Sequence, residues 1–132
     1  MRRRQWAQVG RSVGLSEAEK ATIGTACQQL IDEVLKPRFL SVIRPTEFNY
    51  PIDIYGKWHG ARYRFIQRYR SGFPDNLNEE FDSAFARLDW VSRDLFEVQW
   101  HRHTGVWYCL YRNLSLADAL SAIETDGLLH PV

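Results

Sequence analysis

Between residues 50 and 70, apolar and polar side chains alternate with a period of two, and this alternation constrains the fold more than any other feature of the sequence. Such a period is typical of strands that bury one face. In the first run, the alternating sets are Ile52, Ile54 and Trp58 on one side and Asp53, Tyr55 and Lys57 on the other. In the second run, they are Tyr63, Phe65, Gln67 and Tyr69 on one side and Arg62, Arg64, Ile66, Arg68 and Arg70 on the other. The dipeptide His59-Gly60 between the runs suits a hairpin turn that pairs Ile54 with Phe65, so both apolar rows lie on one face.

Three more strands are predicted after a loop at residues 71–83, at about 84–91, 95–102 and 106–112. A turn at residues 92–94 gives the third and fourth strands a register with well-matched pairs, namely Trp90 with Phe96, Leu88 with Val98, and Ala86 with Trp100. Because every connection but one is short, the strands are expected to form an antiparallel meander.

A helix is predicted before the strands, at about residues 16–36, and a second one after them, beginning at Ser115. Ser16 with Glu19 forms a capping box, and Ser115 with Asp118 repeats that arrangement. Pro37 is expected to end the first helix, because the residue before a proline is pushed out of helical conformation. Both helices carry an apolar stripe, so we expect them to cover the same face of the sheet. The predicted fold is α+β, with an N-terminal helix, an antiparallel meander of about five strands and a C-terminal helix.

Composition fits one globular domain. The chain has 132 residues, of which 45% are hydrophobic and 25% are charged, and its formal net charge is +1. We expect a single domain at residues 16–132 and a flexible basic arm at residues 1–15, in which Trp6 is the candidate for docking on the domain. No stretch has the length of a membrane span, and no apolar run follows the first arginines, so we expect a cytoplasmic protein without a membrane partner. Cys27 and Cys109 are expected to be reduced and mostly buried.

Three short stretches stand beside or within the predicted elements. Ile43-Arg44-Pro45 lies before the first strand, Gly105-Val106-Trp107-Tyr108 lies in the last strand, and Leu114-Ser115-Leu116 opens the final helix. In these stretches and in the order of its elements, the chain resembles a family of small bacterial proteins of unknown function. The resemblance implies a layout of helix, antiparallel strands and helix over most of the chain. It implies no activity, substrate or site residue.

The face of the predicted sheet that points away from the helices is rich in arginine and aromatic side chains. Its candidate binding residues are Arg62, Arg64, Arg68 and Arg70 on the second strand, Arg87 on the third, Gln99 and His101 on the fourth, and Trp107 and Tyr111 on the fifth. Asp53, Asp89 and Glu97 are expected on the same face, with Asp53 diagonal to Arg64 and Asp89 opposite Glu97.

Three interpretations of this face remain open. The charged rows can form an ordinary cross-strand charge ladder. The aromatic residues can instead mark an interface with a second copy of the chain, in a homodimer. Arginines beside exposed rings on a sheet are also a known way to bind single-stranded nucleic acid, although the near-neutral net charge counts against it.

No catalytic or metal-binding constellation emerges from the sequence. His101 and His103 share one side of a strand, but a zinc or copper site needs further ligands. The glycines match no phosphate-binding loop, so no cofactor is expected. The leading hypothesis is a non-enzymatic binding or assembly module that self-associates through the outer face. The alternatives are a nucleic-acid-binding module that uses the Arg and aromatic surface, and a small enzyme that uses His101 and Glu97.

Overall fold

The computed structural model describes residues 14–131 and has the predicted order of elements. The helical segments are α2 (Glu17–Leu30), a π-helical turn (Ile31–Leu35), α3 (Lys36–Phe39), a 3-10 turn (Pro74–Asn76), α4 (Leu116–Thr125) and a second 3-10 turn (Gly127–Leu129). The strands are β1 (Asn49–His59), β2 (Arg62–Ser71), β3 (Glu80–Ser92), β4 (Leu95–His101) and β5 (Trp107–Leu114). They form one antiparallel sheet in the order β1-β2-β3-β4-β5, so the predicted meander is confirmed. Of the predicted arm, residues 1–13 lie outside the described residues.

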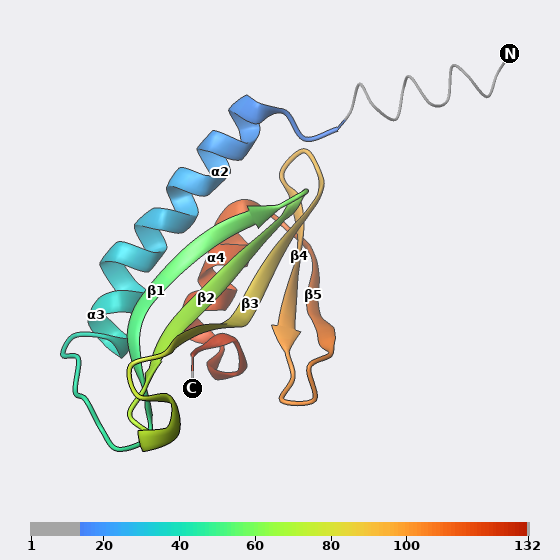
Figure 1. Ribbon diagram of the computed structural model, residues 1–132. Coiled ribbons are helices and arrows are strands. Elements are labelled where there is room, and N and C mark those ends of the chain that lie inside the picture. Colours follow the sequence, from blue (N-terminus) through green and yellow to red (C-terminus); the bar gives the residue numbers. More distant parts are fainter. Residues whose placement is uncertain (1–13, 132) are drawn as a thin grey trace, which may run out of the picture.

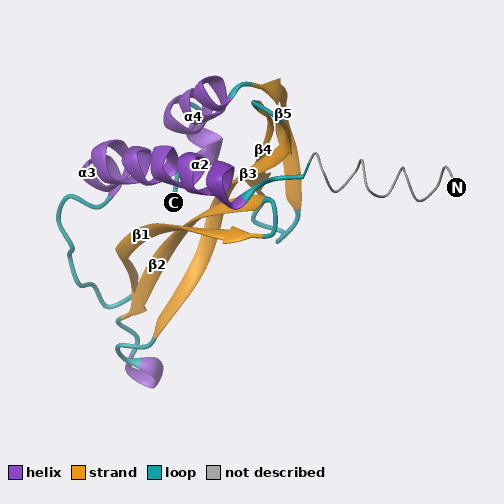
Figure 2. Cartoon of the chain, turned by 90° about the horizontal axis from the view of Figure 1, so that it is seen from above, coloured by secondary structure: helices purple, strands orange, loops and turns teal. Residues whose placement is uncertain are grey.

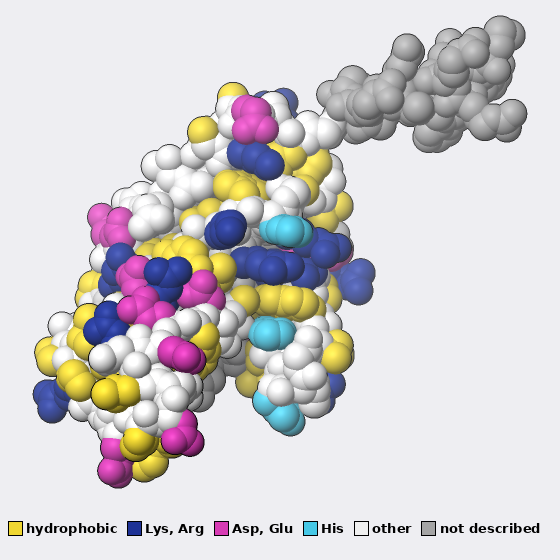
Figure 3. All heavy atoms as spheres, in the orientation of Figure 1, with side chains coloured by type: hydrophobic (Ala, Val, Ile, Leu, Met, Phe, Trp, Pro, Cys, Tyr) yellow, Lys and Arg dark blue, Asp and Glu magenta, His cyan; other side chains and the backbone are white. Residues whose placement is uncertain are grey.

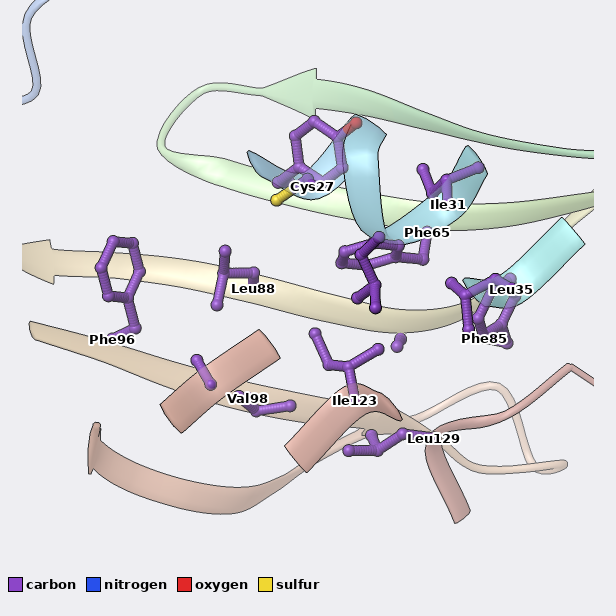
Figure 4. Close-up of a cluster of buried hydrophobic side chains, with 14 of the residues drawn as sticks. Cys27, Ile31, Leu35, Phe65, Phe85, Leu88, Phe96, Val98, Ile123 and Leu129 are labelled. Carbon is purple, nitrogen blue, oxygen red and sulfur yellow. The ribbon is translucent and has the colours of Figure 1, made fainter. Parts of the chain in front are cut away.

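The helices pack on one face of a strongly curved sheet, and no element among the described residues covers its other face (Figures 1 and 2). Side chains of α2, the central strands and α4 meet in one core, in which Cys27, Phe65, Leu88, Val98 and Ile123 are almost completely buried (Figure 4). The aromatic residues expected on this inner face, Trp58, Tyr63, Trp90, Phe96 and Trp100, all belong to the core or pack against it. The face that points away from the helices is called the outer face below.

Both predicted helix caps are present. The Ser16 hydroxyl accepts a hydrogen bond from the Glu19 backbone N–H at 3.1 Å, and the Ser115 hydroxyl accepts one from Asp118 at 3.1 Å. Each cap satisfies a backbone donor that the first helical turn leaves free.

Pro37 does not end the first helix as predicted, because a π-helical turn precedes it. In that turn the Lys36 N–H donates to the carbonyl oxygen of Ile31, five residues back. Pro37 therefore stands in the first turn of α3, where a helix needs no N–H donor. Helical structure continues to Phe39.

The β1–β2 hairpin has a register that differs by two residues from the predicted one. Its turn is Gly60-Ala61, so that Ile54 pairs with Gln67 and not with Phe65. Gly60 has a φ of 62°, which suits the first central position of a type II′ turn. Since the side-chain period of a strand is also two, the shift leaves the residues from Ile54 to Trp58 on their predicted faces.

Strand β3 is longer than predicted and begins at Glu80, inside the segment expected to be a loop. Its first part pairs with β2, with Glu80 opposite Arg70 and Asp82 opposite Arg68. A bulge at Phe85 reverses the alternation, so these two acidic residues lie on the outer face although Ala86 and Leu88 point inward. The predicted β3–β4 register is confirmed in all three pairs.

None of the helices among residues 14–131 has the length and apolar character that crossing a bilayer requires.

The two cysteines are free and differ in accessibility, which predicts two distinct rates of thiol modification. Cys27 is completely buried, and burial raises the pKa of its thiol to about 12. Cys109 lies half-buried on β5. Because the thiolate is the reactive form, we expect a disulfide reagent to modify Cys109 in the native protein and Cys27 only after unfolding. A Cys109→Ser variant should then show no reactive thiol under native conditions, and equal rates for the two thiols would contradict the buried position of Cys27.

Candidate binding surface on the outer face

Two of the four β2 arginines form close ion pairs with carboxylates on β3. The Nε of Arg68 lies 2.9 Å from Oδ1 of Asp82, and Nη2 of Arg70 lies 2.9 Å from Oε2 of Glu80. The hydroxyl of Tyr55 also donates to Asp82 at 2.6 Å. The hydrogen bonds from Arg68 and Tyr55 hold the pKa of the Asp82 carboxyl below its usual value. This part of the outer face is thus a cross-strand charge ladder, with acidic residues that were expected to lie in a loop.

Arg87 is also neutralised, and it is buried. Its Nε and Nη2 donate to the two carboxylate oxygens of Asp89 at 2.7 and 2.9 Å, and the side chain is only 8% exposed. The guanidinium lies over the ring of Trp107, 4.7 Å from its centroid. The imidazole of His101 stacks on the same indole at 4.5 Å. Asp89, Arg87, Trp107 and His101 therefore form a continuous contact chain across β3, β4 and β5.

The predicted pairing of Asp89 with Glu97 is present, and arginines relieve the repulsion between the two carboxylates. Besides Arg87, the side chain of Arg62 approaches Asp89 at 3.9 Å, and that of Arg112 approaches Glu97 at 3.6 Å. Gln99, the next outward residue of β4, is 7% exposed and lies opposite Arg87.

Arg64 differs from the other arginines of this face because no carboxylate neutralises it. Its predicted diagonal partner, Asp53, instead forms an ion pair with Lys36 of α3 at 3.4 Å. Among residues 14–131, Arg64 forms no ion pair, and its Nε is shielded from water without a hydrogen-bond partner. Its charge is therefore uncompensated within the described chain.

Arg64 occupies the middle of a row of three cations. Across the strands it pairs with Lys57 on β1 and with Arg87 on β3, and the same row continues to Gln99 and Cys109. We call Lys57, Arg64 and Arg87 the cationic row. In Figure 3 dark blue side chains form a band across the outer face, between cyan histidine side chains. Lys57 was not singled out from the sequence, although its outward position follows from the same alternation as that of Tyr55.

Tyr111 was predicted to share the outer face with Trp107, and this prediction is wrong. Irregularities in the β4–β5 pairing place Cys109 opposite Gln99 but Tyr111 opposite Val98, which points into the core. Tyr111 therefore packs on the inner side, and its hydroxyl donates to Asp126 at 2.7 Å. The extra residue in β5 reverses the alternation of its last part.

The structure does not bring His101 and Glu97 together as a catalytic pair. They lie four residues apart on one strand, a separation of roughly 13 Å at the usual rise per residue. The Nδ1 of His101 lies 2.8 Å from the carbonyl oxygen of Ala84, and Glu97 faces Arg112. Within the described part of the chain, no group of three or more His, Cys, Asp or Glu side chains is arranged to hold a metal ion.

A family model described as "Domain of unknown function (DUF3024)" matches residues 15–131, which includes every strand and helix named above. Comparisons with curated proteins and with solved structures gave no significant match.

Proposed function

The chain belongs to the DUF3024 family of domains of unknown function, and from the geometry of its outer face we propose that it is a non-enzymatic binding module for single-stranded nucleic acid. The observation that carries the proposal is the uncompensated charge of Arg64 in the middle of the cationic row. A phosphate group beside the guanidinium would supply the countercharge that the chain lacks there.

The cations available to a phosphate chain lie close together. Lys57 and Arg64 are direct cross-strand neighbours, and adjacent strands lie about 5 Å apart. Arg62 follows on the same face of β2, and its side chain is largely exposed, with only a 3.9 Å approach to Asp89. These three side chains can therefore contact consecutive phosphates of an extended strand.

Self-association through the outer face requires exposed apolar area, and the described residues of the cationic row and the charge ladder offer none. The large hydrophobic side chains that are exposed among the described residues lie in loops, at the tip of the sheet and on its edge, and none belongs to the cationic row or the charge ladder. A second copy on a twofold axis would also bring like charges near one another. Nucleic-acid binding therefore fits the chemistry of this face better than self-association does.

Base stacking is expected to contribute little to this binding. The ring of Trp107 is already in contact with Arg87 and His101, so it offers a base less surface than a free indole would. Affinity should then come mainly from phosphate contacts, with little sequence preference.

Binding of a fluorescein-labelled oligothymidylate, followed by fluorescence anisotropy at low salt, tests the proposal. We expect the full-length chain to bind, and Arg64→Gln to weaken binding by about tenfold, as expected for the loss of one charge-assisted contact. The matched control is the double variant Arg70→Gln, Glu80→Gln, which removes an arginine from the same face of the same strand without freeing a carboxylate. It should bind as the wild type does.

Two results would overturn the proposal. One is that the wild-type chain does not bind the oligonucleotide at low salt. The other is that the control variant loses as much affinity as Arg64→Gln, which would show that the paired and unpaired arginines are equivalent.

A further inference from the structure

A cavity of about 430 Å³ lies where the sheet divides. Strand β3 pairs with β2 from Glu80 onward, but its pairing with β4 includes no residue before Ala86. Beyond that point β4 and β5 diverge from β3, and the C-terminal segment lies behind the gap (Figure 1). In Figure 3 the same region is a hollow between two lobes of the molecule, with cyan histidine side chains on the lobe of the β4–β5 hairpin.

We propose that this cavity binds a small planar aromatic anion, meaning an aromatic ring that carries a carboxylate or a phosphate. This site is separate from the cationic row, and the proposal does not depend on nucleic-acid binding. The size of the cavity is within the usual range for small-molecule sites.

The walls of the cavity suit a flat ring. Tyr69, Phe85 and Trp100 contribute aromatic surface, and Leu128 and Pro131 add apolar surface from the C-terminal segment. Three strands and the C-terminal segment supply these residues, so the cavity depends on the complete fold.

The lining of the cavity includes a buried amide. Gln67 is 3% exposed, and its Nε2 donates to the hydroxyl of Tyr69 at 2.7 Å. A buried amide requires hydrogen-bond partners. Together these two side chains give the cavity a polar end beside its aromatic walls, which can orient a ring that carries polar atoms.

The lining includes one formally charged side chain, which is a cation, and three histidines. These are Arg102, His101, His103 and His130, and no aspartate or glutamate is among the lining residues. The guanidinium of Arg102 lies over the Trp100 ring at 5.7 Å, which places a permanent cation beside the largest aromatic wall. An aromatic ring against Trp100 would thus bring an attached anion close to Arg102.

Two of the histidines are held in fixed orientations by backbone carbonyls. Nδ1 of His101 lies 2.8 Å from the oxygen of Ala84, and Nε2 of His130 lies 2.8 Å from the oxygen of Glu124. Because a carbonyl only accepts hydrogen bonds, each of these nitrogens carries a proton. Both rings are therefore fixed parts of the cavity wall.

The test uses amide chemical shifts of the full-length chain, titrated with 2-naphthoate, 1-naphthyl phosphate and the neutral 2-naphthamide. We expect both anions, or one of them, to shift the amides of residues 83–85, 100–105 and 127–131. The anion that binds more tightly identifies the acidic group. The neutral amide should bind at least about fivefold more weakly, which is the usual size of a partly exposed charge interaction.

The Arg102→Gln variant should lose affinity for the anions by about fivefold and keep its affinity for 2-naphthamide. Arg93→Gln, an exposed arginine in the β3–β4 turn, is the matched control and should bind as the wild type does. The proposal is overturned if no probe shifts these amides at millimolar concentration, if the acid and the amide bind equally, or if the shifts map to the cationic row instead.

Discussion

Replacing Asp89 with asparagine is expected to lower the free energy of unfolding by about 3 kcal/mol, because the Arg87 guanidinium is then buried without a countercharge. The two side chains share two hydrogen bonds below 3 Å, and Arg87 is 8% exposed. Loss of Asp89 also removes its repulsion with Glu97 across the strand, so the effect should fall at the lower end of the range for a broken buried pair. Urea denaturation of the variant and the wild type measures the difference.

The control for this prediction removes both charges. In a double variant Arg87→Met, Asp89→Leu, no ion remains buried, and the stability should return to within about 1 kcal/mol of the wild type. A double variant that is less stable than Asp89→Asn would contradict the argument, since it would show that the lost packing and not the unpaired charge dominates.

Replacing Gly72 with alanine is expected to destabilise the protein by about 3 kcal/mol, because the added methyl group has no space. A Cβ at this position would lie 1.9 Å from the carbonyl oxygen of Thr46 and 2.7 Å from that of Phe48. Both are backbone atoms, so no side-chain rotation can relieve the clash. The Gly72 N–H also donates to the Phe48 oxygen at 2.7 Å, and the clash would break this link between the β2–β3 loop and the connector before β1.

Gly127→Ala is the matched control for Gly72→Ala. A Cβ at Gly127 would meet nothing within 4 Å, and its φ is not in the left-handed region. Its unfolding free energy should therefore stay within about 0.5 kcal/mol of the wild type in the same urea experiment. Equal stabilities of the two alanine variants would show that the loop and the connector can separate without lowering the free energy of unfolding.

The sequence was sufficient to predict the order of elements, the meander and both helix caps, because each of these depends on local patterns. The β3–β4 register was predictable for the same reason, since its short turn allows few pairings. The β1–β2 turn was predicted one residue too early, which shifts the register by two, because either His59-Gly60 or Gly60-Ala61 puts the same side chains on the inner face.

The errors on the outer face have one common cause, which is that bulges change the alternation of a strand and leave no clear mark in the sequence. The bulge at Phe85 brings Asp82 to Arg68, and the irregular β5 turns Tyr111 inward. The burial of Arg87 also could not be predicted, because it depends on Trp107, twenty positions later in the chain, lying across its guanidinium. The uncompensated Arg64 became visible only once Asp53 was found beside Lys36.

The salt dependence of oligonucleotide binding tests the central claim most directly, because it counts the phosphates that the chain neutralises. The logarithm of the binding constant should fall linearly with the logarithm of salt concentration, and each contact with a single strand should add about 0.7 to the slope. For the double variant Lys57→Gln, Arg64→Gln, we expect the slope to be smaller than that of the wild type by about 1.4. The same slope in both proteins would contradict the assignment of the cationic row as the phosphate-binding site.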